Sequence, residues 1–140
     1  MTEEEASVRF VIIGCGMVGS RLAADLVVAG HQVAVVDRCR ETLAALGEDF
    51  PGQTVVGAGI DIDVLRQAGV EQADAVVAVT SGDNANLMAA QVASRIFKVG
   101  RVLARVRDPE KAELYRASGF EIMCPTTHNV EMFKQGLLRG

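Results

Sequence analysis

Three glycines near the start of the chain have the spacing of a phosphate-binding turn. Gly14, Gly16 and Gly19 follow an apolar, β-branched run and precede a segment rich in alanine and leucine, which predicts a strand, a tight turn and a helix. The first glycine permits the sharp turn, the second leaves room for a pyrophosphate, and the third lets the helix pack against the strand. The N-terminus of that helix would offer unpaired N–H groups and a partial positive charge to the phosphates.

An acidic residue follows at the place where a ribose-binding carboxylate is needed. Asp37 ends a second apolar run, residues 32–36, and lies 18 residues after Gly19. Dinucleotide-binding domains place this acid ~20 residues after the turn. The alternative is a packing turn with Asp37 as a solvated loop acid. Because the strand, turn, helix and acid occur together, a dinucleotide or adenine-nucleotide site is favoured.

Composition narrows the class of protein. The chain has 140 residues, enough for one domain, with a net charge of −4 and 4% aromatic residues, which argues against nucleic-acid binding. Cys15, Cys39 and Cys124 lack metal-ligand spacing. Residues 1–7 are expected to form a flexible acidic tail rather than a secretory signal, and no apolar run approaches the ~20 residues of a membrane span. We therefore expect a cytoplasmic protein.

Strands and helices are predicted to alternate along the chain. The expected strands cover residues 8–13, 32–36, 53–56, 73–79, 102–106 and 120–123. The pattern predicts a Rossmann-like, doubly wound α/β fold with six parallel strands in the order 3-2-1-4-5-6. Polar or small residues follow four strands, at 14–16, 37, 57–59 and 80–81, and these ends should converge on one crevice.

Two of the predicted helices carry apolar stripes. One helix is expected from Asn84 to Phe97. Its stripe consists of Leu87, Ala90, Ser94 and Phe97, widened by Met88, Val92 and Ile96. The last helix, within residues 126–140, carries Val130, Phe133 and Leu137. That stripe is either ordinary core or, as we favour, the face of a C-terminal crossover helix that packs in a dimer.

Six segments of the chain have a recognisable combination of residues, at 13–19, 35–37, 65–70, 73–80, 83–87 and 104–108. Together they resemble the RCK or KTN domain, also called TrkA-N, a regulatory nucleotide-binding domain of potassium channels and uptake systems. Thr80, Asp83 and Asn86 form a Thr-x-x-Asp-x-x-Asn pattern that generic dehydrogenases do not usually carry after the fourth strand. The resemblance covers about residues 8–125, most of the chain.

The resemblance implies a protein that binds NAD(H), ADP, AMP or ATP without consuming it. It implies a homodimer that assembles into a larger ring and gates a membrane-embedded potassium transporter, to which it is peripheral. The implied binding residues are Gly14, Cys15, Gly16, Met17, Val18 and Gly19 at the phosphates, Asp37 and Arg38 near the ribose, Ala58, Gly59 and Ile60 beside the adenine, and Thr80, Ser81, Asn86 and Arg105 in or near the crevice.

Two departures from the family pattern bear on the ligand. Met17 stands where members that favour ATP often carry arginine, and Ala58 stands where the family often has aspartate. NAD(H) is therefore the expected ligand, with ADP or AMP next. Asp37 should also disfavour NADP(H), because its carboxylate would repel a 2′-phosphate, although Arg38 and Arg40 could approach such a group.

Two other functions compete with regulation. A small NAD-dependent oxidoreductase, or a fragment of one, needs a substrate domain and a positioned acid or base. No Tyr-x-x-x-Lys or His–Asp pair stands in a suitable place, and Tyr115 lies in a late helix. A scaffold with a vestigial site is disfavoured by the intact glycine turn and Asp37. We predict no catalytic and no metal-binding residues.

A few residues near the site have competing roles. His31 is expected to pack or lie at the surface. Cys15 and Cys39 are expected to be small buried residues rather than redox sensors. Arg105 sits on a strand that looks buried, so a phosphate or carboxylate partner is favoured over a solvated guanidinium.

Overall fold

The strands of the domain form one parallel sheet. A computed structural model describes residues 8–139, and the proposed tail at 1–7 lies outside the described residues. The strands are β1 (Arg9–Ile13), β2 (Gln32–Asp37), β3 (Gln53–Val56), β4 (Ala75–Ala78), β5 (Arg101–Arg105) and β6 (Glu121–Met123). They lie in the order β3-β2-β1-β4-β5-β6, and each neighbouring pair is parallel. The predicted Rossmann-like sheet is confirmed, with its switch point between β1 and β4.

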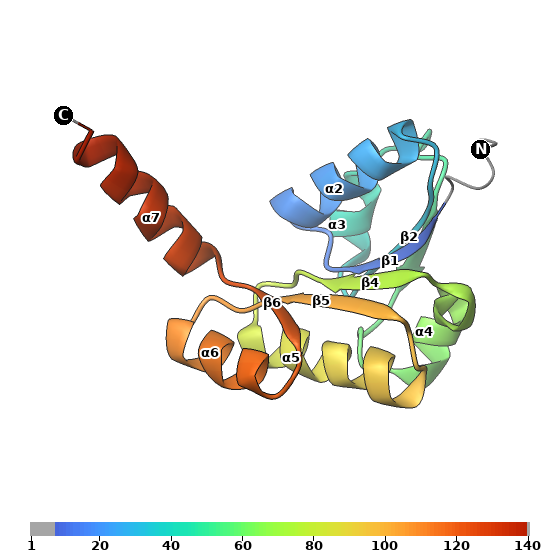
Figure 1. Cartoon of the computed structure of the whole chain (residues 1–140). Helices are drawn as coiled ribbons and strands as arrows, with labels where there is room; N and C mark the ends of the chain where they lie inside the picture. Colours follow the sequence, from blue (N-terminus) through green and yellow to red (C-terminus); the bar gives the residue numbers. More distant parts are fainter. Residues whose placement is uncertain (1–7, 140) are drawn as a thin grey trace, which may run out of the picture.

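Helices cover both faces of this sheet (Figure 1). They are α2 (Met17–Val28), α3 (Arg40–Ala44), α4 (Ile62–Gln67), α5 (Asp83–Gln91), α6 (Pro109–Ala117) and α7 (Pro125–Leu137), with a 3-10 turn at Val70–Gln72 and a π-helical turn at Val92–Ile96. Helices α2 and α3 lie on one face, and α4, α5 and α6 lie on the other. Right-handed crossovers on either side of the switch point produce this division.

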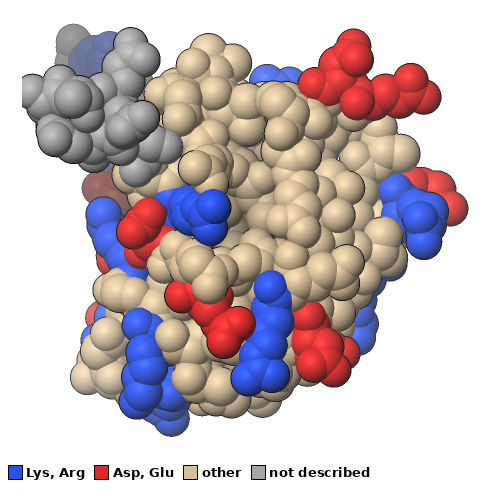
Figure 2. Space-filling view, turned by 90° about the vertical axis from the view of Figure 1, so that its right-hand side faces the viewer, with Lys and Arg blue, Asp and Glu red and all other residues tan. Residues whose placement is uncertain are grey.

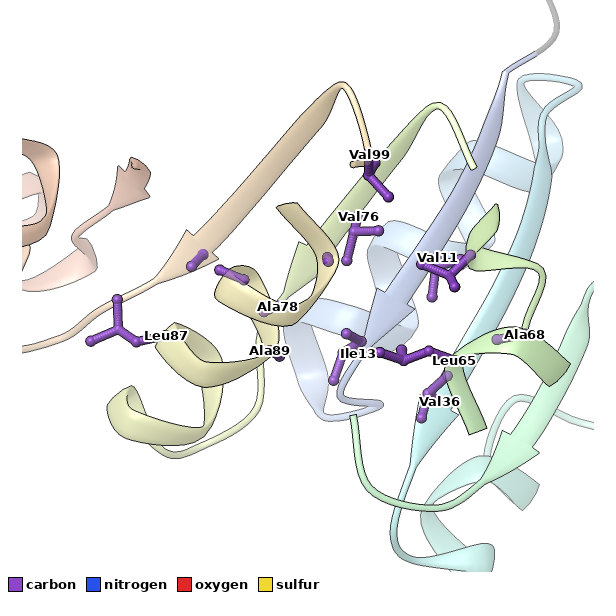
Figure 3. Close-up of a cluster of buried hydrophobic side chains, with 14 of the residues drawn as sticks. Val11, Ile13, Val36, Leu65, Ala68, Val76, Ala78, Leu87, Ala89 and Val99 are labelled. Atoms are coloured by element: carbon purple, nitrogen blue, oxygen red, sulfur yellow. The ribbon is translucent and has the colours of Figure 1, made fainter. Parts of the chain in front are cut away.

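Alternate residues of the strands belong to two separate cores. The core beneath α4 and α5 contains Val11, Ile13, Val36, Leu65 and Val76 (Figure 3), and the core beneath α2 and α3 contains Ile12, Ala23, Val35 and Leu43. A sheet buried on both faces needs strands that are apolar almost throughout. Each fully buried large side chain contributes about 1.5–3 kcal/mol. Packing on both faces holds the carboxyl ends of the strands in a fixed arrangement.

The helix after β4 differs from the prediction. Regular α-helix stops at the π-helical turn Val92–Ile96, where a wider turn changes the direction of the side chains. Leu87 is buried as expected, but Ile96 is 57% exposed and Met88 is 49% exposed. The stripe predicted from a regular helical period was therefore too wide. Met88 faces the candidate site described below.

Helix α7 projects away from the body of the domain (Figure 1). It begins at Pro125, one residue before the expected boundary, and none of its residues is buried. Phe133 is 72% exposed and Leu137 is 81% exposed. The apolar stripe of α7 is therefore not part of the core of the described chain.

Charges of both signs are scattered over the face where the chain enters β1. Figure 2 shows this face, the right-hand side of Figure 1, with Lys and Arg interspersed with Asp and Glu around an uncharged area. The face therefore offers no extended region of one sign. Within residues 8–139, every helix is too short or too polar to cross a membrane.

Candidate functional site

Two of the three glycines of the turn are required by the fold, and one is not. Gly14 has φ +109°, and a Cβ atom there would lie 2.8 Å from the backbone of Val79 and Thr80. A Cβ atom at Gly19 would overlap the carbonyl oxygen of Gly14, whereas one at Gly16 would meet nothing within 4 Å. Gly16 is also the N-cap of α2 and provides no side-chain cap, so the first N–H groups of this helix face open space.

The carboxylate of Asp37 holds the glycine turn against the end of β2. Its Oδ2 accepts the N–H of Cys15 at 2.8 Å, and its Oδ1 accepts the N–H of Cys39 at 2.8 Å. A carboxylate has about four lone-pair positions, so both oxygens can still accept a ribose hydroxyl. Asp37 therefore fixes the turn and also presents an acceptor beside it.

Asn86 holds the opposite wall of the site. It is 1% exposed, and its Oδ1 accepts the N–H and the hydroxyl of Thr80 at 2.8 and 2.7 Å. Its Nδ2 donates to the carbonyls of Thr80 and Arg105 at 3.0 and 2.9 Å. These four hydrogen bonds engage both ends of the amide. Asn86, expected among the binding residues, thus lies behind the wall and positions Thr80.

Arg105 makes hydrogen bonds to the protein backbone. Its Nη2 donates to the carbonyls of Val79 and Thr80 at 3.0 and 2.8 Å, and among the described residues no carboxylate pairs with it, so the phosphate partner stays a prediction. Its Nε is buried and has no partner among the described residues. Burial and the nearby charge of Arg107 lower the pKa of Arg105, against the opposing effect of Asp83. The guanidinium still adds a positive charge to this wall.

These walls enclose a hollow of about 1020 Å³ at the carboxyl ends of the strands. The predicted residues that line it are Gly14, Cys15, Gly16, Met17, Val18, Asp37, Arg38, Ala58, Gly59, Ile60, Thr80, Ser81 and Arg105. Of the predicted residues, Gly19 and Asn86 lie behind the lining. The hollow has the volume of a large small-molecule pocket, for which about 300–1,000 Å³ is usual. Its open space at Gly16 and its free helix N-terminus fit a nucleotide phosphate.

Ten residues of the lining were not among the predicted site residues, and three of them bear on the site. Asn84 and Met88 come from α5, and Arg107 follows β5. Arg107 had a recognisable signal, because residues two apart in an extended segment point the same way and Arg105 was already a candidate. Met88 was misassigned to the apolar stripe, which hid its exposure.

The side chains of Cys15, Cys39 and His31 have surroundings that explain them without a catalytic role. Cys15 is buried, and burial, with a smaller effect from Asp37, raises the pKa of its thiol, which therefore stays protonated. Cys39 is exposed and its thiol donates to Glu41, so the expected burial of Cys39 is wrong. His31 accepts the N–H of Val8 at 3.0 Å and packs edge-on against a phenylalanine ring, as expected of a packing residue. Residues 8–139 hold no cluster of three potential metal ligands.

Comparison with known protein families shows to which family of nucleotide-binding domains the chain belongs. The model of the TrkA-N domain family matches residues 10–125. The chain belongs to the TrkA-N domain family. A relative from Streptomyces coelicolor, the Trk system potassium uptake protein TrkA, is 47% identical over 129 residues. The match covers 92% of this chain and 56% of that protein, so the TrkA-N chain spans about half the length of its relative.

Solved structures share the fold of this TrkA-N domain. The Shewanella denitrificans Kef CTD in its AMP-bound form has a TM-score of 0.79 and 19% identity, over 94% of this chain and 80% of that one. The GsuK structure bound to ADP has a TM-score of 0.79 and 22% identity, over 94% of this chain and 34% of that one. At these sequence identities the similarity shows a shared fold and no more.

Proposed function

We propose that this TrkA-N domain is the nucleotide-binding regulatory part of a potassium uptake system. The observation that carries the proposal is the hollow itself, where the glycine turn, Asp37 and Thr80 meet at the switch point of the sheet. The name of the Streptomyces coelicolor relative supplies the transport system. The domain would work in the cytoplasm, peripheral to the membrane, as a homo-oligomer bound to a membrane-embedded potassium transporter.

The ligand we propose is NAD(H), with ADP or AMP as the next candidates. The open space at Gly16 would admit the phosphates, and Asp37 would accept the ribose hydroxyls. Titration calorimetry should give tighter binding for NADH than for NADPH, because the Asp37 carboxylate repels a 2′-phosphate. Arg38 also lines the hollow and opposes this preference. Tighter binding of NADPH would contradict the assignment of Asp37.

The nucleotide would act as a signal rather than as a substrate. Among the described lining residues there is no histidine, glutamate, lysine or tyrosine, and the Asp37 carboxylate is engaged by backbone N–H groups. The side chains therefore supply no evident general acid or base for hydride chemistry. Binding energy would instead favour one arrangement of the assembly over another, and about 1.4 kcal/mol of differential affinity shifts that balance tenfold.

Two measurements test the proposal. Mass spectrometry of the purified protein should identify a co-purifying adenine nucleotide. In vesicles that contain the cognate transporter, nucleotides that bind should change the flux of potassium or rubidium. Unchanged flux with every nucleotide that binds would overturn the regulatory function. Steady oxidation of NADH with a small substrate would favour the oxidoreductase instead.

A further inference from the structure

Helix α7 is tied to the rest of the domain through its first turn. The Thr127 hydroxyl donates to Cys124 Sγ at 3.4 Å. Beyond Thr127, no hydrogen bond or ion pair within residues 8–139 joins α7 to the sheet or to the helices that cover it. The direction of α7 therefore depends on the junction at Cys124.

Cys124 is anchored to the segment that follows β5. It is buried, and its thiol donates to the carbonyl oxygen of Arg107 at 3.7 Å. One residue earlier on each segment, the N–H of Val106 donates to the carbonyl of Met123 at 2.9 Å. The chain before α6 and the chain after it thus run side by side up to the start of α7.

Arg107 also belongs to the wall of the nucleotide hollow. Its Nη1 donates to the carbonyl of Ser81 at 3.2 Å, and both residues line the hollow. The carboxylate of Asp83 accepts the N–H groups of Arg107 and Asp108 at 2.8 and 3.1 Å. Among the described residues, the bond to Ser81 is the only one that the Arg107 guanidinium makes, although this group carries five N–H donors. Arg107 therefore has donors left for an anionic ligand.

We propose that Arg107 is a positioning residue that couples an anionic group of the bound nucleotide to the direction of α7. A phosphate that draws the guanidinium from Ser81 would move the backbone at Arg107. Its carbonyl would pass that movement to Cys124 and Thr127. This coupling rests on the proposed nucleotide-binding function and gives the residues through which binding would reach α7. Because coupling between two sites is reciprocal, loosening the junction at α7 must also loosen the wall of the hollow.

The test removes one link that lies outside the hollow. Thr127→Val deletes the hydroxyl that reaches Cys124 and keeps the β-branched shape. Thr126→Val is the matched control, because Thr126 is an exposed neighbour without a side-chain hydrogen bond among the described residues. The chain has no tryptophan, so Phe133→Trp places a single indole on α7 in all these proteins. ADP and NAD⁺ are the probes.

Saturating ADP or NAD⁺ is expected to shift the indole emission of the Phe133→Trp protein and of its Thr126→Val form. In the Thr127→Val form the nucleotide should still bind, as measured by calorimetry, but the shift should fall at least about fivefold, the lower end of ordinary coupling. Thr127→Ser keeps the hydroxyl and should restore the shift. Equal shifts in the Thr127→Val and Thr126→Val proteins would overturn the proposal.

A second measurement needs no nucleotide. In ligand-free protein, Thr127→Val is expected to speed amide hydrogen exchange at Arg107 and Asp108 by about fivefold, whereas Thr126→Val leaves it unchanged. Changes confined to the first turn of α7 would show that Thr127 acts only locally, and the coupling would be wrong. If neither ADP nor NAD⁺ binds the parent, the proposed function fails, and the exchange comparison still decides the coupling.

Discussion

At the scale of single residues, the glycines of the turn separate binding from folding. Gly16→Val adds a side chain into open space, so the fold should persist, while nucleotide affinity should fall at least about tenfold, or 1.4 kcal/mol. Gly100→Val is the control, because a Cβ atom there also meets nothing within 4 Å. Calorimetry and thermal denaturation compare the two variants. Equal affinity in both would place the nucleotide elsewhere.

Gly19→Ala, unlike Gly16→Val, should destabilise the fold itself. Its Cβ atom would overlap the carbonyl of Gly14, which belongs to the turn itself and cannot swing aside as a side chain can. Overpacking of this kind costs about 1–3 kcal/mol. We expect a lower free energy of unfolding in urea even without nucleotide. Unchanged stability would show that α2 can shift away from β1.

Asn86 offers a further prediction, on the wall opposite the turn. Asn86→Ala leaves the N–H of Thr80 and the carbonyl of Arg105 without their buried partner, and each such loss costs about 1–3 kcal/mol. Urea denaturation should show a drop in stability of at least that size. Asn84→Ala, at an exposed residue of the same helix, should change stability much less. Similar losses in both variants would contradict the positioning role.

The sequence predicts best those residues whose structural role is set by their near neighbours along the chain. Gly14 and Gly19 follow from the geometry of one turn, and Asp37 follows from its distance to that turn along the chain. Asn86 and Arg107 depend instead on β5 lying beside β4, because their hydrogen bonds join residues 19 and 26 positions apart in the chain. Sequence spacing placed Asn86 near the crevice, but only the folded structure shows that its amide is fully engaged.

At the scale of elements, the course of the helices was also only partly predictable from local sequence. The strand order follows from alternating strands and helices, so topology was predictable. The π-helical turn Val92–Ile96 was not, because a regular 3.6-residue period has no place for an extra residue in one turn. The direction of α7 was not predictable either, because its apolar stripe looks the same whether the helix covers its own sheet or projects from it.

Asp83 joins the start of α5 to the segment before α6, and this link predicts a pH dependence. Burial is the largest single effect and opposes the charged form of Asp83. Hydrogen bonds from the N–H groups of Arg107 and Asp108, together with the positive charges of Lys111 and Arg107, outweigh it and hold the pKa of Asp83 below the ordinary value. A pKa that is lower in the folded state stabilises the fold at neutral pH. This stabilisation is lost as the pH falls through the folded pKa, below about 4.

Asp83→Asn should therefore lower the melting temperature at pH 7, and the difference from the parent should shrink below about pH 4. Asp25→Asn, at an exposed residue of α2 without a side-chain hydrogen bond in the described chain, is the control. Thermal denaturation over a pH series measures both. A difference that stays constant with pH would show that the charge of Asp83 does not contribute.

At the scale of the whole molecule, α7 exposes an apolar face that no other part of the described chain covers. Val130, Phe133 and Leu137 form an apolar stripe with helical spacing, and each is at least half exposed. We expect a homodimer in which α7 packs on the partner. In a two-fold interface each residue is used twice, and burying one large apolar side chain contributes about 1.5–3 kcal/mol.

Phe133→Asp should therefore weaken dimer association by at least about a hundredfold, which corresponds to roughly 3 kcal/mol. Gln135→Asp introduces the same charge two residues away, on the other side of α7, and should leave the dimer intact. Light scattering at ~50 μM measures the mass, a concentration at which an ordinary specific interface is occupied. A monomeric parent protein, or a Phe133→Asp protein that remains dimeric, would show that the stripe of α7 is not the contact between copies.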